Sequence, residues 1–73
     1  MKAENVQLGM LVQVHRDYSE AILRDRIGIV RQRYGNGRYS PFEVHFENVE
    51  DRQLRLLWAG DLEKAKVFYK HYG

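Results

Sequence analysis

The sequence contains no cysteine, which excludes a disulfide framework, a zinc–thiolate centre and thiol redox chemistry. It also contains no long hydrophobic run, since no apolar stretch approaches the ~20 residues that a membrane-spanning helix needs. No signal-peptide pattern opens the chain. Small secreted domains usually depend on disulfides, so their absence favours a reducing compartment. We therefore expect a cytoplasmic protein that does not associate with a membrane.

The common patterns of catalytic and metal sites are missing as well. The histidines are His15, His45 and His71, and no two of them have the close spacing of paired metal ligands. The glycines form no phosphate-binding loop, and no serine lies in a nucleophile-elbow sequence. The adjacent acids Glu50 and Asp51 fall in an expected turn, where solvation leaves carboxylates ordinary. We predict a protein that is not an enzyme and that holds no metal and no cofactor.

The chain is short, and its charges are segregated. At 73 residues it is long enough for one domain, which buries only roughly 60% of the surface of its unfolded chain. The net charge is only +2, yet residues 24–38 hold five arginines and one acid. Residues 43–51 hold four acids and no lysine or arginine, and residues 64–73 hold three lysines and no acid. This distribution suits a charged partner, or it lets neighbouring strands neutralise each other.

Period-two alternation predicts the first three strands. We expect strands at residues 11–16 and 27–34, and a third that begins at Pro41 and points Phe42, Val44 and Phe46 inward. Residues 17–25 read as a long loop with one helical turn capped by Ser19. Gly28, inside the second strand, indicates a bulge or a close approach of another backbone.

A fourth strand is predicted at residues 53–58, with Leu54 and Leu56 facing inward. Trp58, at its end, is expected to pack in the core rather than to serve as an exposed contact. Residues 59–63 are expected to form a 3₁₀ turn that leads to a short fifth strand. We divide the chain into a barrel, 1–63, and a basic, aromatic tail, 64–73, whose side chains either cover the barrel or contact a partner.

The second and third strands are joined by Gly35-Asn36-Gly37, a strong hairpin signal because glycine and asparagine tolerate positive φ. A hairpin closing on Asn36 places Arg31 and Arg33 near His45 and Glu43 across the ladder. Three uses remain open for this hairpin: a protein contact, a phosphate contact, or internal packing of tyrosines with arginine–glutamate pairing. The candidate binding residues are Arg31, Arg33, Tyr34, Arg38, Tyr39, Glu43 and His45.

The order of these elements resembles a small SH3-like barrel, and in detail the KOW-type domains of transcription elongation factors and ribosomal proteins. The matching segments are Gly9 to Val14, the G-x-V of Gly28 to Val30, and the V-x-F of Val44 to Phe46. The resemblance covers roughly residues 6 to 63. It implies an all-β fold of four to five antiparallel strands. A weaker resemblance links the chain to small phage-encoded proteins that bind bacterial RNA polymerase.

These features favour a non-enzymatic binding module that docks on a gene-expression assembly, with bacterial RNA polymerase as the first expected partner. We expect it to act as a monomer and to regulate transcription by occupying a protein surface. One alternative is an RNA- or DNA-binding KOW-like barrel. Another is a small barrel subunit of an electron-transfer or metabolic enzyme complex.

Overall fold

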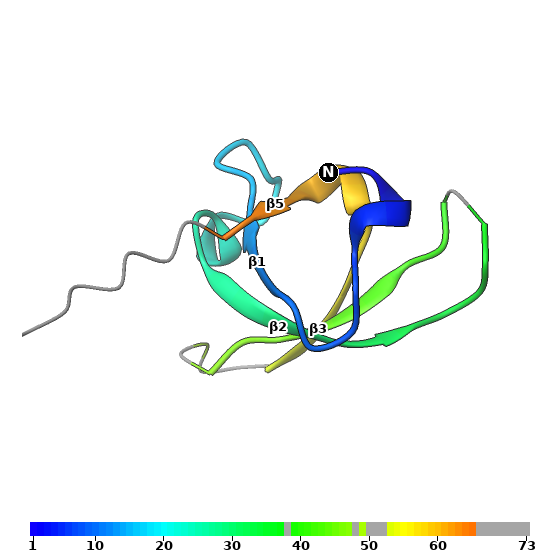
Figure 1. Ribbon diagram of the computed structural model, residues 1–73. Coiled ribbons are helices and arrows are strands. Elements are labelled where there is room, and N and C mark those ends of the chain that lie inside the picture. The colour runs from blue at the N-terminus through cyan, green and yellow to red at the C-terminus, as the bar shows by residue number, and fades with distance from the viewer. Residues whose placement is uncertain (38, 48, 50–52, 66–73) are drawn as a thin grey trace, which may run out of the picture.

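The computed structural model describes residues 1–37, 39–47, 49 and 53–65. Five antiparallel strands form one sheet in the order β4-β3-β2-β1-β5, and they curl around a common core (Figure 1). This confirms an all-β fold. In the described part of the chain no helix has the length and hydrophobicity to cross a membrane. The elements are η1 (Ala3–Asn5), β1 (Leu11–Val14), η2 (Ala21–Leu23), β2 (Ile27–Arg33), β3 (Phe42–His45), β4 (Leu54–Leu57), η3 (Ala59–Asp61) and β5 (Leu62–Lys64).

The two edges of the sheet, β4 and β5, do not pair with each other within the described ranges, so the sheet is not closed into a full barrel. Side chains and the chain terminus link its edges to other segments instead. Arg55 on β4 donates to both carboxylate oxygens of Glu20, in the β1–β2 loop, at 2.7 Å each. The N-terminal amine of Met1 donates to the carbonyl of Leu62 on β5 at 2.9 Å. The long loop and the N-terminal segment therefore secure both edges.

The inward face of the sheet follows the alternation on β3. Phe42 and Val44 are fully buried and pair with Leu57 and Arg55 on β4. On the other side of β3, Val44 pairs with Val30 of β2, which is also fully buried. Paired residues of an antiparallel ladder point to the same face, so one set of side chains fills the interior. The core comprises Val6, Val12, Val14, Leu23, Val30, Phe42, Val44, Phe46, Val49, Leu57, Ala59 and Leu62.

The prediction for the inward face of the fourth strand was wrong. Leu54 and Leu56 are 49% and 53% exposed, whereas Leu57 is fully buried. The cause is the register: Leu56 lies opposite the outward Glu43, and Leu57 lies opposite the buried Phe42. A shift of one residue in a strand moves every side chain to the other face.

Trp58, just after β4, is 48% exposed, so the expected core position of this residue was also wrong. The expected 3₁₀ turn and short fifth strand are confirmed as η3 and β5. The helical turn expected in the long loop exists as η2. Glu20 occupies the N-cap position and its side chain makes no capping hydrogen bond, so the expected cap by Ser19 was wrong. β1 ends at Val14, two residues before the expected boundary.

Gly28 makes the close approach that the sequence indicated. A Cβ at this position would lie 2.6 Å from Val44 Cγ1, 2.8 Å from the His45 carbonyl oxygen and 2.9 Å from Phe46 Cδ1. Only a glycine allows β2 to pass this close to the end of β3 without displacing buried atoms. The bulge in β2 lies further along, between Val30 and Gln32.

Candidate functional site

The β2–β3 hairpin does not have the expected register. Gln32 pairs with Glu43 and Arg33 pairs with Phe42, after a shift between Val30 and Gln32. Arg31 and Arg33 therefore do not lie opposite His45 and Glu43: His45 already pairs with Ile29 before the bulge, so the whole hairpin has another register than expected. A bulge places two residues opposite one and redirects the side chains that follow. It returns Arg33 to the core-facing side of the hairpin and leaves Arg31 exposed.

Arg33 covers the end of the core. Its guanidinium lies 5.3 Å from the centroid of the Phe42 ring, a cation–π geometry. Its Nε donates to the carbonyl of Gly35 at 3.0 Å, and its Nη2 donates to the carbonyl of Gly37 at 3.4 Å. The side chain thus shields a buried ring and holds the hairpin turn while remaining partly accessible.

Tyr34 and Tyr39, on the two arms of the hairpin, occupy different surroundings. The phenol of Tyr34 donates to Glu43 Oε1 at 3.1 Å, and this bond raises the pKa of Tyr34. Tyr39 is 77% exposed. Its backbone carbonyl accepts a 2.8 Å hydrogen bond from Trp58 Nε1, which ties the hairpin to the end of β4.

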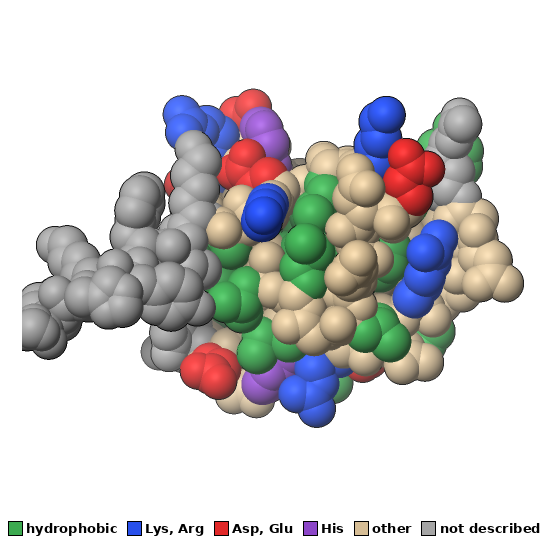
Figure 2. Space-filling model, in the orientation of Figure 1, with side chains coloured by type: hydrophobic (Ala, Val, Ile, Leu, Met, Phe, Trp, Pro, Cys, Tyr) green, Lys and Arg blue, Asp and Glu red, His purple; other side chains and the backbone are tan. Residues whose placement is uncertain are grey.

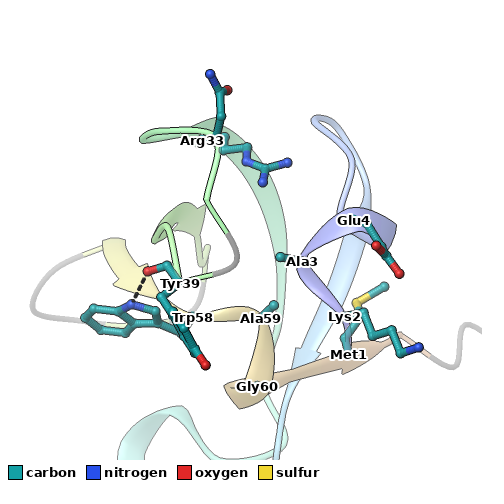
Figure 3. A pocket seen from close by; sticks show the side chains of 10 residues that line it. Met1, Lys2, Ala3, Glu4, Arg33, Tyr39, Trp58, Ala59 and Gly60 are labelled. Carbon is teal, nitrogen blue, oxygen red and sulfur yellow. Dashed lines mark hydrogen bonds between the residues drawn. The ribbon is translucent and has the colours of Figure 1, made fainter.

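A groove of about 740 Å³ lies beside this Tyr39–Trp58 contact. Figure 3 shows Trp58 and Tyr39 on one side, the N-terminal residues on the other, and Arg33 above them. We call it the end groove. Its lining residues are Met1, Lys2, Ala3, Glu4, Arg33, Asn36, Tyr39, Trp58, Ala59 and Gly60.

The polar atoms of Trp58 are already paired, which determines what the indole offers to a ligand. Its Nε1 donates to Tyr39, and its backbone N–H donates to Asp61 Oδ2 at 3.3 Å. The half-exposed ring therefore presents an apolar face. Lys2 and Arg33 contribute two positive charges to the end groove and Glu4 one negative charge. The groove thus combines aromatic surface with a small positive excess.

The structure divides the predicted site residues between two surfaces. Arg33 and Tyr39 line the end groove. Tyr34, Glu43 and His45 lie together on the outer side of β2 and β3, where His45 Nε2 is 3.3 Å from Gln53 Oε1. Arg31 lies at the bulge, and Arg38 is outside the described residues.

Of the aromatic and charged side chains that line the groove, Trp58, Lys2 and Glu4 were not anticipated. The run from Leu54 to Trp58 has apolar residues at both odd and even positions, so alternation alone did not determine the side on which Trp58 lies. No sequence signal joins Lys2 to the hairpin, because both border one groove only where the bond from Met1 to Leu62 fixes the N-terminal segment beside β5.

No protein-family model matches the chain, and searches of curated proteins and of solved structures give no match. Among the described residues, no three histidine, aspartate or glutamate side chains are grouped so that they can hold a metal ion.

Proposed function

We propose that this protein is a non-enzymatic docking module with a KOW-like, SH3-type architecture, and that it binds a protein surface through the end groove. The expected partner is a component of the gene-expression machinery, with bacterial RNA polymerase first. Binding would regulate transcription by blocking or stabilising the contact of another factor on the same surface.

The observation that carries this proposal is the grouping of Trp58, Tyr39 and Arg33 around one hollow. Tryptophan, tyrosine and arginine dominate the energetics of protein–protein contacts, particularly where they border a pocket. Trp58 is held by its bond to Tyr39, so its ring loses little conformational freedom on binding. An ordered aromatic wall of this kind favours a partner that inserts an apolar side chain.

The preference for polymerase rests on the segregated charges of the sequence and on the resemblance to small polymerase-binding proteins. A surface with separate basic and acidic regions selects partners by charge and speeds their encounter. The cations in the end groove, Lys2 and Arg33, favour an acidic or mixed apolar–acidic target over a basic one.

Direct binding to purified bacterial RNA polymerase tests the proposal. Trp58→Ala is expected to cost about 2 kcal/mol, roughly a thirty-fold loss of affinity, as for a hot-spot residue. Leu8→Ala is the matched control, because Leu8 is 62% exposed and does not line the end groove. Absence of binding by the unmodified protein rejects polymerase as the partner, and equal binding by the Trp58 and Leu8 variants rejects the groove.

A nucleic-acid-binding barrel is the second candidate, because Arg33 and Lys2 beside Trp58 and Tyr39 also suit phosphate contacts and base stacking. Against it stand the acids Glu4, in the groove, and Glu43, on the neighbouring strand face. The two candidates differ in salt dependence. Affinity for a polynucleotide falls steeply and log-linearly with salt, as each neutralised phosphate releases counterions. A groove that binds a protein through aromatic contacts shows a shallow salt dependence.

A further inference from the structure

The outer face of the sheet carries a row of residues that crosses four strands. Leu54 on β4 pairs with His45 on β3, His45 pairs with Ile29 on β2, and Ile29 pairs with Leu11 on β1. We call these four residues the outer row. Leu11, Ile29 and His45 point away from the core, because each alternates with a buried neighbour on its strand. Leu54 shares their side of the sheet because it pairs with His45. Three of the four are large aliphatic residues.

Ile27, next to this row on β2, extends the apolar surface; it is 44% exposed, and Leu54 is 49% exposed. A hollow of about 410 Å³ lies here between β2 and the end of β3, bordered by Leu11, Ile27, Ile29 and His45. Figure 2 shows hydrophobic side chains gathered in patches between charged ones on the face that it presents. An apolar sheet face with a hollow of this size is suited to receive large side chains.

The last residues of the chain begin at one end of the outer row. The amide of Ala65, just after β5, donates to the carbonyl of Leu11 at 3.5 Å. The chain then continues with residues 66–73, KVFYKHYG, which lie outside the described residues. This segment is rich in large apolar side chains, namely Val67, Phe68, Tyr69 and Tyr72.

The segment is long enough to cross the face. Eight residues in extended form span roughly 26 Å. The distance across the outer row, from β1 to β4, corresponds to three strand spacings, or roughly 14 Å. A segment that starts beside Leu11 can therefore reach Leu54 with several residues in excess.

Acids outnumber cations on this side of the sheet, although Arg31, at the bulge of β2 beside the Gln32–Glu43 pair, is an exposed cation there. Three acids belong to this side of the sheet. Glu43 pairs with the outward Leu56, and Glu47 borders the hollow. Glu63 pairs with Gln13, which in turn pairs with Ile27. Residues 66–73 carry two lysines and no acid. Arg26, a cation at the rim of the hollow, donates its Nε to the carbonyl of Ile22 at 3.3 Å, so its guanidinium is held toward the β1–β2 loop.

We propose that residues 66–73 bind the outer face of the same molecule, with Phe68 or Tyr69 in the hollow and the lysines over the acids. Direct covalent linkage gives the segment an effective concentration in the millimolar range, which makes even a weak contact populated. The contact is separate from the end groove and does not rest on the function proposed above.

A spin label tests this contact in the full chain. The protein has no cysteine, so Gly73→Cys gives one attachment site for a nitroxide. A docked segment brings the label close to the far end of the outer row. We expect the amide signals of Leu54 and His45 to lose at least half their intensity relative to the reduced sample, while those of Asn36 and Gly60, in the end groove, keep theirs. Equal intensities at these four amides would overturn the proposal.

Two lysine substitutions give the matched comparison. Ile27 and Ile22 are 44% and 45% exposed, but only Ile27 borders the hollow. Ile27→Lys should abolish the intensity loss at Leu54, and Ile22→Lys should preserve it. If Ile27→Lys leaves the loss intact, the outer face is not the binding surface. A mixture of spin-labelled chains and separate isotope-labelled chains shows whether the segment binds its own molecule or another one. Signal loss at Leu54 of the isotope-labelled chains in this mixture would mean binding between molecules and would contradict the proposal.

Discussion

Replacing Gly28 with alanine is expected to destabilise the fold, because the new methyl group has no space. Its Cβ would lie 2.6 Å from Val44 Cγ1 and 2.8 Å from the His45 carbonyl oxygen. Val44 is fully buried, and the carbonyl belongs to a strand that pairs on both sides, so neither atom moves freely. Overpacking of a close-packed core typically costs about 1–3 kcal/mol.

The alanine also stiffens the unfolded chain, which offsets about 0.4–1 kcal/mol of this cost. The net expected loss is about 1–2 kcal/mol in the free energy of unfolding. For a domain of this length that loss lowers the melting temperature by roughly 4–16 °C. Thermal unfolding followed by circular dichroism measures the melting temperature, and urea titration measures the free energy.

Gly60→Ala is the control, because a Cβ at Gly60 has no atom within 4 Å. We expect this variant to equal or slightly exceed the stability of the unmodified protein. If Gly28→Ala melts at the unmodified temperature, the close passage of β2 against β3 is wrong. If both variants lose stability equally, the effect belongs to glycine replacement in general and not to this contact.

Three other predictions follow from side-chain contacts. Arg33→Ala should lower the free energy of unfolding by about 1 kcal/mol in urea titration, since it removes a cation–π contact and turn hydrogen bonds; unchanged stability would contradict its capping role. A double-mutant cycle on Arg55 and Glu20 should give a coupling of about 1 kcal/mol, because the arginine side chain is only 16% exposed; zero coupling would show that this pair does not secure the edge. In ¹³C NMR titration, Glu43→Gln should lower the pKa of Tyr34, which its bond to Glu43 raises; a constant pKa would exclude that bond.

The sign of the Tyr34 effect on stability follows from the same bond. The folded-state pKa is raised above the ordinary value of 10.0, so the folded protein holds the phenolic proton more tightly than the unfolded chain does. The hydrogen bond therefore contributes its full stability below pH ~10, and this contribution is lost as the pH rises through the folded-state pKa.

The all-β class and most strand positions could be predicted, but the inward face of β4 could not. On β3, strict alternation of apolar and polar residues around Phe42 and Val44 determined the face. On β4, leucines occupy adjacent positions, so both faces of the strand are apolar. The hydrophobic pattern therefore does not show which residues point into the core. The pairing with β3 decides the matter, and that pairing depends on the length and path of the connection between the strands.

The candidate site was predicted only in part, for a related reason. Arg33 and Tyr39 belong to it, but the bulge in β2 changes the partners of every hairpin residue beyond Val30. A bulge of one residue leaves no clear mark in the sequence when the residues are polar. Trp58 and Lys2 enter the groove through contacts between segments far apart in the chain, which no local pattern encodes.

The most direct test of the docking function is capture from a bacterial lysate, with and without nuclease, using the unmodified protein and a Trp58→Ala/Tyr39→Ala double variant. Mass spectrometry identifies the captured proteins. We predict that the unmodified protein retains a specific partner after nuclease treatment, RNA polymerase being the first expected, and that the double variant loses it. Partners that disappear with nuclease, or that the double variant captures equally well, would contradict a protein-binding end groove.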